Sequence, residues 1–297
     1  MKKYYSYIIW IFSLIIFFFV LHKTDEANQA WCESYLAKLE LERFYRSRLD
    51  EKKEEEIRQI IRKAEEKRAG IVIEANIRRK MEAESQKAAA YVRNLAKTYP
   101  QVKGRIIIPG TKIDFPVVQG KDNDFYLDHD YDNSYYINGG VFIDHVHKGD
   151  FSDDNTVIYG HNVRIGYIFH DLDKFRDKNF IKKHSEIIID TPVKRRIFDV
   201  VCAMDVKVDA NYRAYSYDGL EYENYLNLIR KNNILKGKPL PTRNDKIITL
   251  STCSDISDRY AVVAIERKDT YIKPKNFDYL KERFLHDRRL STDIFIY

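Results

Sequence analysis

The chain has 297 residues, 44% hydrophobic and 32% charged, which is enough for one sizeable globular domain with additional segments. The net charge of +6 arises from 51 basic and 45 acidic residues mixed along the chain, so it does not indicate a nucleic-acid partner. Three widely separated cysteines, Cys32, Cys202 and Cys253, form no C-x-x-C pair, which argues against a disulfide framework and a structural zinc site.

The first segment predicts a membrane anchor. Lys2 and Lys3 precede an uncharged, mostly apolar run at residues 4–21, which would span roughly 27 Å as a helix. We therefore expect residues 1–24 to form a single-pass transmembrane helix in the cell membrane. The positive-inside rule places the N-terminus in the cytoplasm and the rest of the chain outside the cell. A cleaved signal peptide is the alternative, and it would also export the chain.

Residues 25–98 predict a charged helical stalk. The stretch E-K-K-E-E-E-I-R-Q-I-I-R-K-A-E-E-K-R-A contains good helix formers with opposite charges four residues apart. Apolar residues recur at helical spacing, but Arg68 breaks the heptad, so a solvated charged helix is favoured over a coiled coil. The more apolar A-A-A-Y-V-R-N-L-A-K near the end predicts packing on the next domain.

Residues 99–270 predict a mainly β domain. Seven or eight short β-type runs alternate with turn signals, which is typical of a closed barrel or a sandwich. Two helical inserts are expected, one near 167–183 and one at 220–231. The second insert places four apolar side chains on one face: Tyr222, Tyr225, Leu226 and Ile229. A further helix at 276–288 is expected within a C-terminal extension, residues 271–297.

Cys253 is the candidate nucleophile. It ends the strand-like run I-I-T-L-S-T-C, and polar residues follow it, so its thiol can reach solvent and react if a neighbouring base or cation activates it. A small core residue is the alternative for any cysteine in a strand, and Cys202, within F-D-V-V-C-A-M-D-V, fits that alternative.

His161 is the best candidate base among eight histidines. It follows the strand-like run T-V-I-Y and Gly160, which would allow an unusual backbone turn that projects the imidazole from a loop. His145 and His147 in D-H-V-H suggest a metal pair, but no third ligand pattern accompanies them. We therefore interpret them as solvated loop residues and expect no metal or cofactor.

Arg259 begins the last strong strand. If the loop after Cys253 closes a hairpin-like turn, the two residues lie on adjacent strand ends, and the guanidinium can donate to an oxygen that gains charge during attack. An ordinary surface ion pair with Asp255 or Asp258 is the alternative, and the sequence alone favours it.

Together, T-V-I-Y-G-H-N, I-T-L-S-T-C and R-Y-A-V-V-A resemble the sortases, the membrane-anchored cysteine transpeptidases of Gram-positive bacteria. The segment I-P-G-T-K-I-D-F-P-V-V-Q-G-K-D-N-D-F-Y-L resembles class B, as does the helix L-E-Y-E-N-Y-L. The resemblance implies an eight-stranded sortase β-barrel with His161, Cys253 and Arg259 as the catalytic trio. It also implies substrate-binding roles for four residues: Asn123, Leu127, Tyr212 and Ser251.

The implied activity is cleavage of a C-terminal sorting signal after threonine. A thioacyl intermediate then passes the surface protein to an amine of a peptidoglycan precursor or a pilin. Two other interpretations remain open. One is an L,D-transpeptidase-like cell-wall enzyme, although the threonine before Cys253 and the serine after it do not match S-x-G-C-R. The other is a non-catalytic, membrane-tethered scaffold.

Overall fold

The computed structural model describes residues 26–45, 51–163, 167–213, 219–253, 258–271 and 273–293. The predicted anchor at residues 4–21 lies outside these residues. None of the helices within the described ranges has the length and apolar character needed to cross a membrane. The chain divides into two compact units, one of residues 82–270 and one formed by the described residues of 1–81 and 271–297.

The helical unit contains α2 (Glu26–Tyr45), the first part of α3 (Glu51–Thr98) and α6 (Phe277–Asp293). A salt bridge of 2.7 Å between Lys38 Nζ and Glu65 Oε1 joins α2 to α3, and the ring of Phe277 lies against α3 at Gly70. Within the described residues of 25–98, the predicted helical character is confirmed by two helices, α2 and the 48-residue α3. The helix predicted at 276–288 corresponds to α6.

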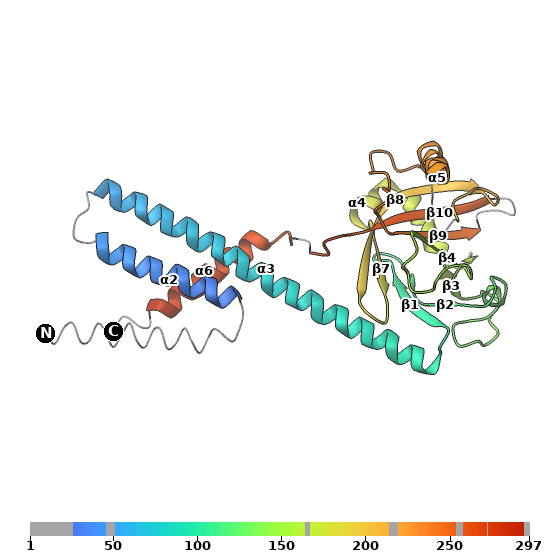
Figure 1. The fold of residues 1–297 in the computed structure, drawn as a ribbon, viewed down its shortest axis with the longest axis horizontal. Coiled ribbons are helices and arrows are strands. Elements are labelled where there is room, and N and C mark those ends of the chain that lie inside the picture. Colours follow the sequence, from blue (N-terminus) through green and yellow to red (C-terminus); the bar gives the residue numbers. More distant parts are fainter. Residues whose placement is uncertain are drawn as a thin grey trace. The chain divides into compact units, whose positions relative to one another are not determined.

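The other unit is a closed β-barrel with the strand order β1-β2-β3-β4-β9-β10-β8-β7 (Figure 1). Its strands are β1 (Val102–Ile107), β2 (Asp114–Gln119), β3 (Val141–Ile143), β4 (Asn155–Tyr159), β7 (Glu186–Asp190), β8 (Arg195–Lys207), β9 (Ile247–Cys253) and β10 (Asp258–Glu266). β2 pairs with β3 and β4 with β9 in parallel, and the other neighbours are antiparallel. The predicted eight strands and their closure into a barrel are thus confirmed.

Short elements connect the barrel strands. They are η1 (Phe125–Leu127), the two-stranded sheet of β5 (Asn162–Val163) and β6 (Tyr167–Ile168), η2 (His170–Arg176), α4 (Lys178–Lys183) and α5 (Gly219–Asn232). The helical insert expected near 167–183 is therefore β6 followed by two short helices, and the insert expected at 220–231 is α5.

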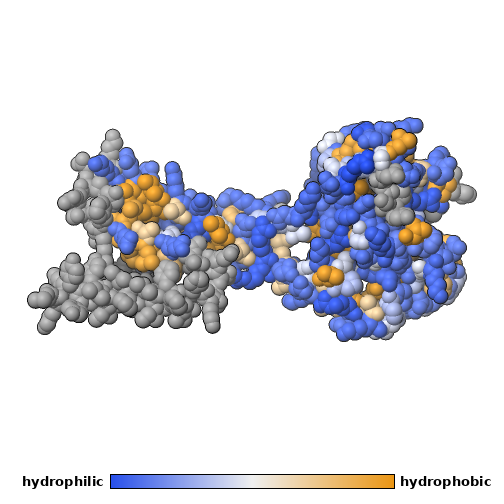
Figure 2. Space-filling model, viewed as in Figure 1, coloured by the Kyte–Doolittle hydropathy of each residue, from blue (hydrophilic) through white to orange (hydrophobic). Residues whose placement is uncertain are grey.

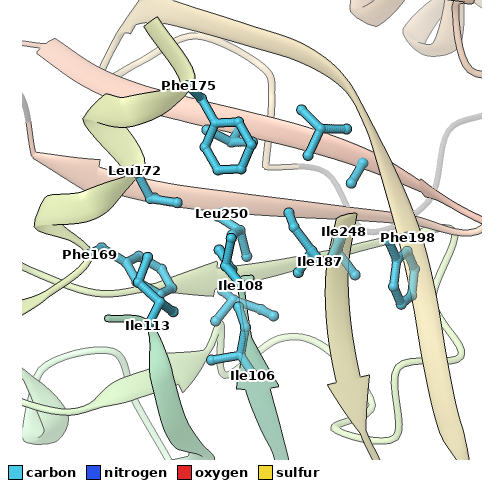
Figure 3. Close-up of a cluster of buried hydrophobic side chains, with 14 of the residues drawn as sticks. Ile106, Ile108, Ile113, Phe169, Leu172, Phe175, Ile187, Phe198, Ile248 and Leu250 are labelled. Atoms are coloured by element: carbon cyan, nitrogen blue, oxygen red, sulfur yellow. The ribbon is translucent and has the colours of Figure 1, made fainter. Parts of the chain in front are cut away.

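The barrel interior is filled by aliphatic and aromatic side chains from opposite walls (Figure 3). Ile106 of β1, Ile187 of β7, Phe198 of β8 and Leu250 of β9 are all fully buried there. In β1, buried and partly buried residues alternate, as expected for a strand with one face on the core. Burial of apolar side chains on this scale is the main force that closes the barrel.

A second cluster lies between the barrel wall and α5. The four predicted apolar residues of the helix are buried there, together with Cys202 of β8 and Val263 of β10. Burial raises the pKa of the Cys202 thiol to about 12. Cys202 is therefore a core residue, as its sequence context predicts, and its thiol stays protonated at neutral pH.

A third cluster joins the last part of α3 to the barrel. Val92 is fully buried with Val118, Tyr126 and Phe142, and the Ser85 hydroxyl accepts a hydrogen bond of 2.9 Å from the backbone N–H of Arg195. The apolar end of the predicted stalk therefore packs on the barrel, and the compact unit begins at residue 82 within α3. The visible outer surface of this unit is mostly hydrophilic, with small separate hydrophobic patches (Figure 2).

Candidate active site

Two parallel strands and one antiparallel strand bring the three candidate catalytic residues to one end of the barrel. Tyr159 of β4 pairs with Ser251 of β9, and the N–H of Gly160 donates to the Ser251 carbonyl at 3.3 Å. His161 and Cys253 each lie two residues beyond this pair, at the same end of neighbouring strands. Arg259 of β10 stands directly opposite Cys253 in the antiparallel ladder. The expected hairpin-like juxtaposition of residues 253 and 259 is confirmed for the backbone, whereas the Cys253 side chain lies outside the described part of the structure.

A pocket of about 300 Å³ opens at this end of the barrel. Its described lining is Asn123, Asp124, Leu127, Phe142, Tyr159, Gly160, His161, Arg213, Ser251, Thr252 and Arg259. The pocket thus contains two of the candidate catalytic side chains and three of the four candidate substrate-binding residues. Leu127 is 42% exposed, so it is available to a ligand and is not a core residue.

The imidazole of His161 is oriented by a backbone carbonyl. Its Nε2 lies 2.9 Å from the carbonyl oxygen of Leu127. Because a carbonyl oxygen only accepts hydrogen bonds, Nε2 carries the proton in this contact, and Nδ1 is the nitrogen left to gain or lose one. Gly139 makes room for this carbonyl. It has φ +64°, and a Cβ there would lie 2.6 Å from the Leu127 oxygen.

Gly160 is required for a different reason from the one that the sequence suggests. The expectation of an unusual backbone turn is wrong, because Gly160 is not among the residues with positive φ. A Cβ at this position would instead approach the ring of Phe169 to 2.8 Å. The glycine therefore allows the buried Phe169 to pack closely under the strand end that precedes His161.

Arg259 is held by its own neighbour, although not by an ion pair with it. Its Nη1 donates to the backbone carbonyl of Asp258 at 3.0 Å, whereas the Asp258 carboxylate accepts from Lys207 Nζ at 2.6 Å. The alternative of an Arg259–Asp258 ion pair is therefore wrong, and Asp255 lies outside the described residues. The backbone contact fixes the guanidinium at the pocket.

A buried carboxylate, missed by sequence reasoning, organises one wall of the pocket. Asp144 accepts hydrogen bonds from Asn123 Nδ2 at 2.9 Å and from the Tyr159 hydroxyl at 2.8 Å. Burial by itself would raise the pKa of Asp144, but hydrogen bonds from Asn123, Tyr159 and the Val146 N–H outweigh it and lower the pKa. The carboxylate thus stays ionised and fixes which polar atoms of Asn123 and Tyr159 face a ligand. Only the segment V-F-I-D, a strand run ending in an acid, hinted at this role.

Tyr212 does not line the pocket. It is fully buried, and its hydroxyl shares a 2.9 Å hydrogen bond with Ser251 Oγ. The Tyr212 carbonyl accepts from Asn155 Nδ2 at 3.0 Å, and the Asn155 side-chain oxygen accepts from Thr249 at 2.7 Å. The structure therefore places Tyr212 behind Ser251, where it ties the loop at 208–213 to β9 and cannot directly cover a bound peptide.

The D-H-V-H histidines differ from each other. His145 is exposed, with Nδ1 3.3 Å from Asp144 Oδ1. The expectation that His147 is a solvated loop residue is wrong, because it is only 5% exposed and its Nε2 accepts from the Val157 N–H at 3.0 Å. Burial lowers the pKa of His147, although the charges of Asp153 and Asp144 oppose this effect. Among the described residues, no group of three or more His, Cys, Asp or Glu side chains is placed to hold a metal ion.

Comparison with known proteins identifies the family. Residues 106–267 match the Sortase domain. "Sortase B" of Listeria monocytogenes is 32% identical over 168 residues, covering 56% of this chain and 68% of the relative. "Sortase B" of Staphylococcus aureus is 28% identical over 163 residues, covering 54% and 67%.

Solved structures agree with this match. Clostridium perfringens sortase B is 31% identical, with a TM-score of 0.55 over 59% of this chain and 99% of that one. A Staphylococcus aureus sortase B–substrate complex has a TM-score of 0.57 at 25% identity, over 67% of this chain and all of that one. The L,D-transpeptidase interpretation is therefore set aside. The chain belongs to the sortase family and is a class B sortase, a cysteine transpeptidase.

Proposed function

We propose that this sortase cleaves a C-terminal sorting signal after a threonine and joins the surface protein to an amine of the cell wall or of a pilin. The observation that carries the proposal is the meeting of three strand ends at one pocket, with residues 253 and 259 in register and His161 in the lining. Residues 4–21 would anchor the enzyme in the cell membrane with the barrel outside the cell.

In the proposed first half-reaction, the Cys253 sulfur attacks the threonine carbonyl, and Arg259 donates hydrogen bonds to the oxygen that becomes negative. The C–N bond then breaks, and His161 gives the proton on Nδ1 to the leaving amine, which leaves a thioester on Cys253. The contact of Nε2 with the Leu127 carbonyl supports this choice of nitrogen.

In the second half-reaction, the acceptor amine attacks the thioester carbonyl and loses its extra proton to His161. The C–S bond breaks, and Cys253 leaves as a thiolate paired with the protonated imidazole. A new amide bond replaces the one that was cleaved, so atoms and charges balance without a further reactant.

The test is incubation of the full-length chain, in mild detergent, with a library of sorting-signal peptides and an amine acceptor. Mass spectrometry should find an acyl adduct on Cys253 and a transpeptidation product whose mass contains the acceptor. Cys253→Ala should lower product formation by at least about a thousandfold, because the nucleophile is gone.

Cys202→Ala is the matched control. It removes a buried thiol, so it should lower the free energy of unfolding by about 1–2 kcal/mol while adduct formation on Cys253 persists. The scaffold interpretation predicts the opposite pattern. If the chain is a non-catalytic scaffold, no peptide forms an adduct, and a thiol-directed vinyl sulfone labels Cys253 no faster than it labels free cysteine.

A further inference from the structure

The described lining of the pocket has an unbalanced set of charges. Arg213 and Arg259 contribute two permanent positive charges, and Asp124 contributes the one carboxylate among the described lining residues. The ionised Asp144 lies behind the lining, where its two oxygens accept from Asn123 and Tyr159. Arg259 is assigned to the reacting carbonyl in the proposed function. Arg213 has no such assignment, and neither composition nor strand pattern singled it out in the sequence.

Arg213 is held in place at the pocket by its own loop. One Nη2–H donates to the Val208 carbonyl, and the guanidinium lies 5.4 Å from the centre of the Tyr212 ring. Tyr212 is itself fixed through its hydroxyl to Ser251 and through its carbonyl to Asn155. The carbonyl contact and the ring contact together favour one orientation of the guanidinium at the pocket.

The charge of Arg213 is not neutralised by an acid within the described structure. Its contacts there are a carbonyl and an aromatic ring, whereas other arginines of the barrel pair with carboxylates: Arg105 with Asp114, Arg195 with Asp190 and Arg196 with Glu266. The positive charge of Arg213 also reaches across the pocket, since it counteracts part of the burial-driven rise in the pKa of Tyr159.

We propose that Arg213 is a specificity-determining residue that selects sorting signals carrying an acidic side chain. A carboxylate placed in the pocket would form a charge-assisted, bidentate pair with the guanidinium fork, a geometry that an amide or an ammonium group cannot reproduce. The inference rests on the proposed function, because it assumes that a peptide occupies this pocket.

The experiment uses peptides in which each position flanking the threonine is set in turn to Glu, Gln or Lys. The peptides are amidated at the C-terminus so that the side chain supplies the carboxylate. Acyl-adduct formation on the full-length chain should favour Glu over the isosteric Gln by about tenfold at one position. Arg213→Gln should abolish that ratio, and Arg213→Glu should shift the preference at the same position to Lys.

Arg243→Gln is the matched control. The Arg243 guanidinium lies 4.7 Å over the Tyr222 ring and donates to the Gly219 carbonyl at 3.0 Å, so it has similar contacts outside the pocket. This variant should keep the full Glu over Gln ratio. Asp124→Asn should also keep that ratio, because its charge has the opposite sign and would act on basic side chains.

Failure of the inference is distinct from failure of the proposed function. The role of Arg213 would be overturned if peptides react but show no preference for Glu, or if the preference persists in Arg213→Gln. Either result would leave the proposed transpeptidation intact. If no peptide forms an adduct, equilibrium binding of the same Glu and Gln peptides to Cys253→Ala decides the inference independently. Equal affinities of the Glu and Gln peptides for Cys253→Ala would contradict the proposed role of Arg213.

Discussion

The two ends of β10 use arginine in different ways. At the Glu266 end, Arg196 forms a two-pronged pair with Glu266 at 2.6 and 2.8 Å, and Arg267 reaches Asp199 at 2.9 Å and Glu186 at 2.8 Å. At the Asp258 end, Arg259 and Arg213 donate to backbone carbonyls and face a pocket.

This difference separates side chains that hold strands together from side chains that line a pocket. Near Glu266, the Arg196–Glu266 pair joins β8 to β10. Arg267, the residue after β10, pairs with Glu186 of β7 and Asp199 of β8. These ion pairs therefore connect strands that are distant in sequence. A carbonyl contact orients a guanidinium without neutralising it. The comparison therefore predicts that changes at one end mainly alter stability, and changes at the other end mainly alter turnover.

The largest effect is expected from paired substitutions of Arg259 and Arg267. Arg259→Gln should lower kcat by about a hundredfold to a thousandfold through loss of oxyanion stabilisation, with little change in unfolding. Arg267→Gln should lower the free energy of unfolding by about 1–2 kcal/mol because two partly exposed carboxylates lose their partner. Steady-state kinetics and urea unfolding measure the two outcomes. Equal losses of kcat in both variants would contradict the different roles assigned to the two ends of β10.

A smaller effect is expected from Gly139→Ala, which acts on the orientation of His161. The new Cβ would collide with the Leu127 carbonyl that binds Nε2, so kcat should fall by about tenfold. Gly237→Ala is the control, because Gly237 also has positive φ, at +81°, but a Cβ there meets no atom within 4 Å. Both variants carry the backbone cost of about 1–2 kcal/mol, and the difference between their kcat values isolates the histidine contact.

Asp144→Asn should act mainly on peptide binding. Asn123 and Tyr159 donate to different oxygens of Asp144, and the amide keeps only one acceptor oxygen, so one of the two residues loses its partner. KM should therefore rise by about fivefold while kcat changes less. Because the pKa of Asp144 lies below the ordinary value of 3.8, this rise should be constant between about pH 5 and 8. Asp150→Asn is the control, since the Asp150 carboxylate accepts from the exposed loop residue Ser152. A fall in kcat with unchanged KM would contradict the positioning role.

The smallest effect concerns His147 and appears in stability alone. Burial lowers the folded-state pKa of His147, so the unfolded chain binds a proton more readily below about pH 6.5 and stability falls as the pH decreases. The wild-type chain should therefore lose about 1 kcal/mol more than His147→Gln between pH 7.5 and 5.5. Urea unfolding at both values measures this difference. Parallel losses would show that His147 titrates normally in the folded protein.

The sequence predicted those features that depend on local pattern. The barrel strands were visible as β-branched runs, and the positions of His161, Cys253 and Arg259 followed from polar residues at strand ends. The four apolar residues of α5 followed from helical spacing. In each case a short window of sequence contains the physical cause.

The features that the sequence did not predict depend on partners far along the chain. The buried Tyr212 is bonded through its hydroxyl to Ser251 and through its carbonyl to Asn155, and the buried His147 accepts from the Val157 N–H. Arg213 follows Tyr212 directly, so this network also helps to position the loop that carries Arg213 to the pocket. Neither a propensity nor a periodicity encodes such pairings, so only the folded barrel reveals them.

Closure of the barrel limits how a peptide can be recognised. Each of the eight barrel strands between residues 102 and 266 already has a neighbour on both sides. A peptide that extends a barrel strand by β-augmentation would therefore need a stretch that is left unpaired on one side, as in β8, which pairs with β7 only over residues 195–199. At the pocket, the described lining offers side chains to a ligand, so a substitution among them alters the surface that a peptide meets while the barrel strands keep their pairing.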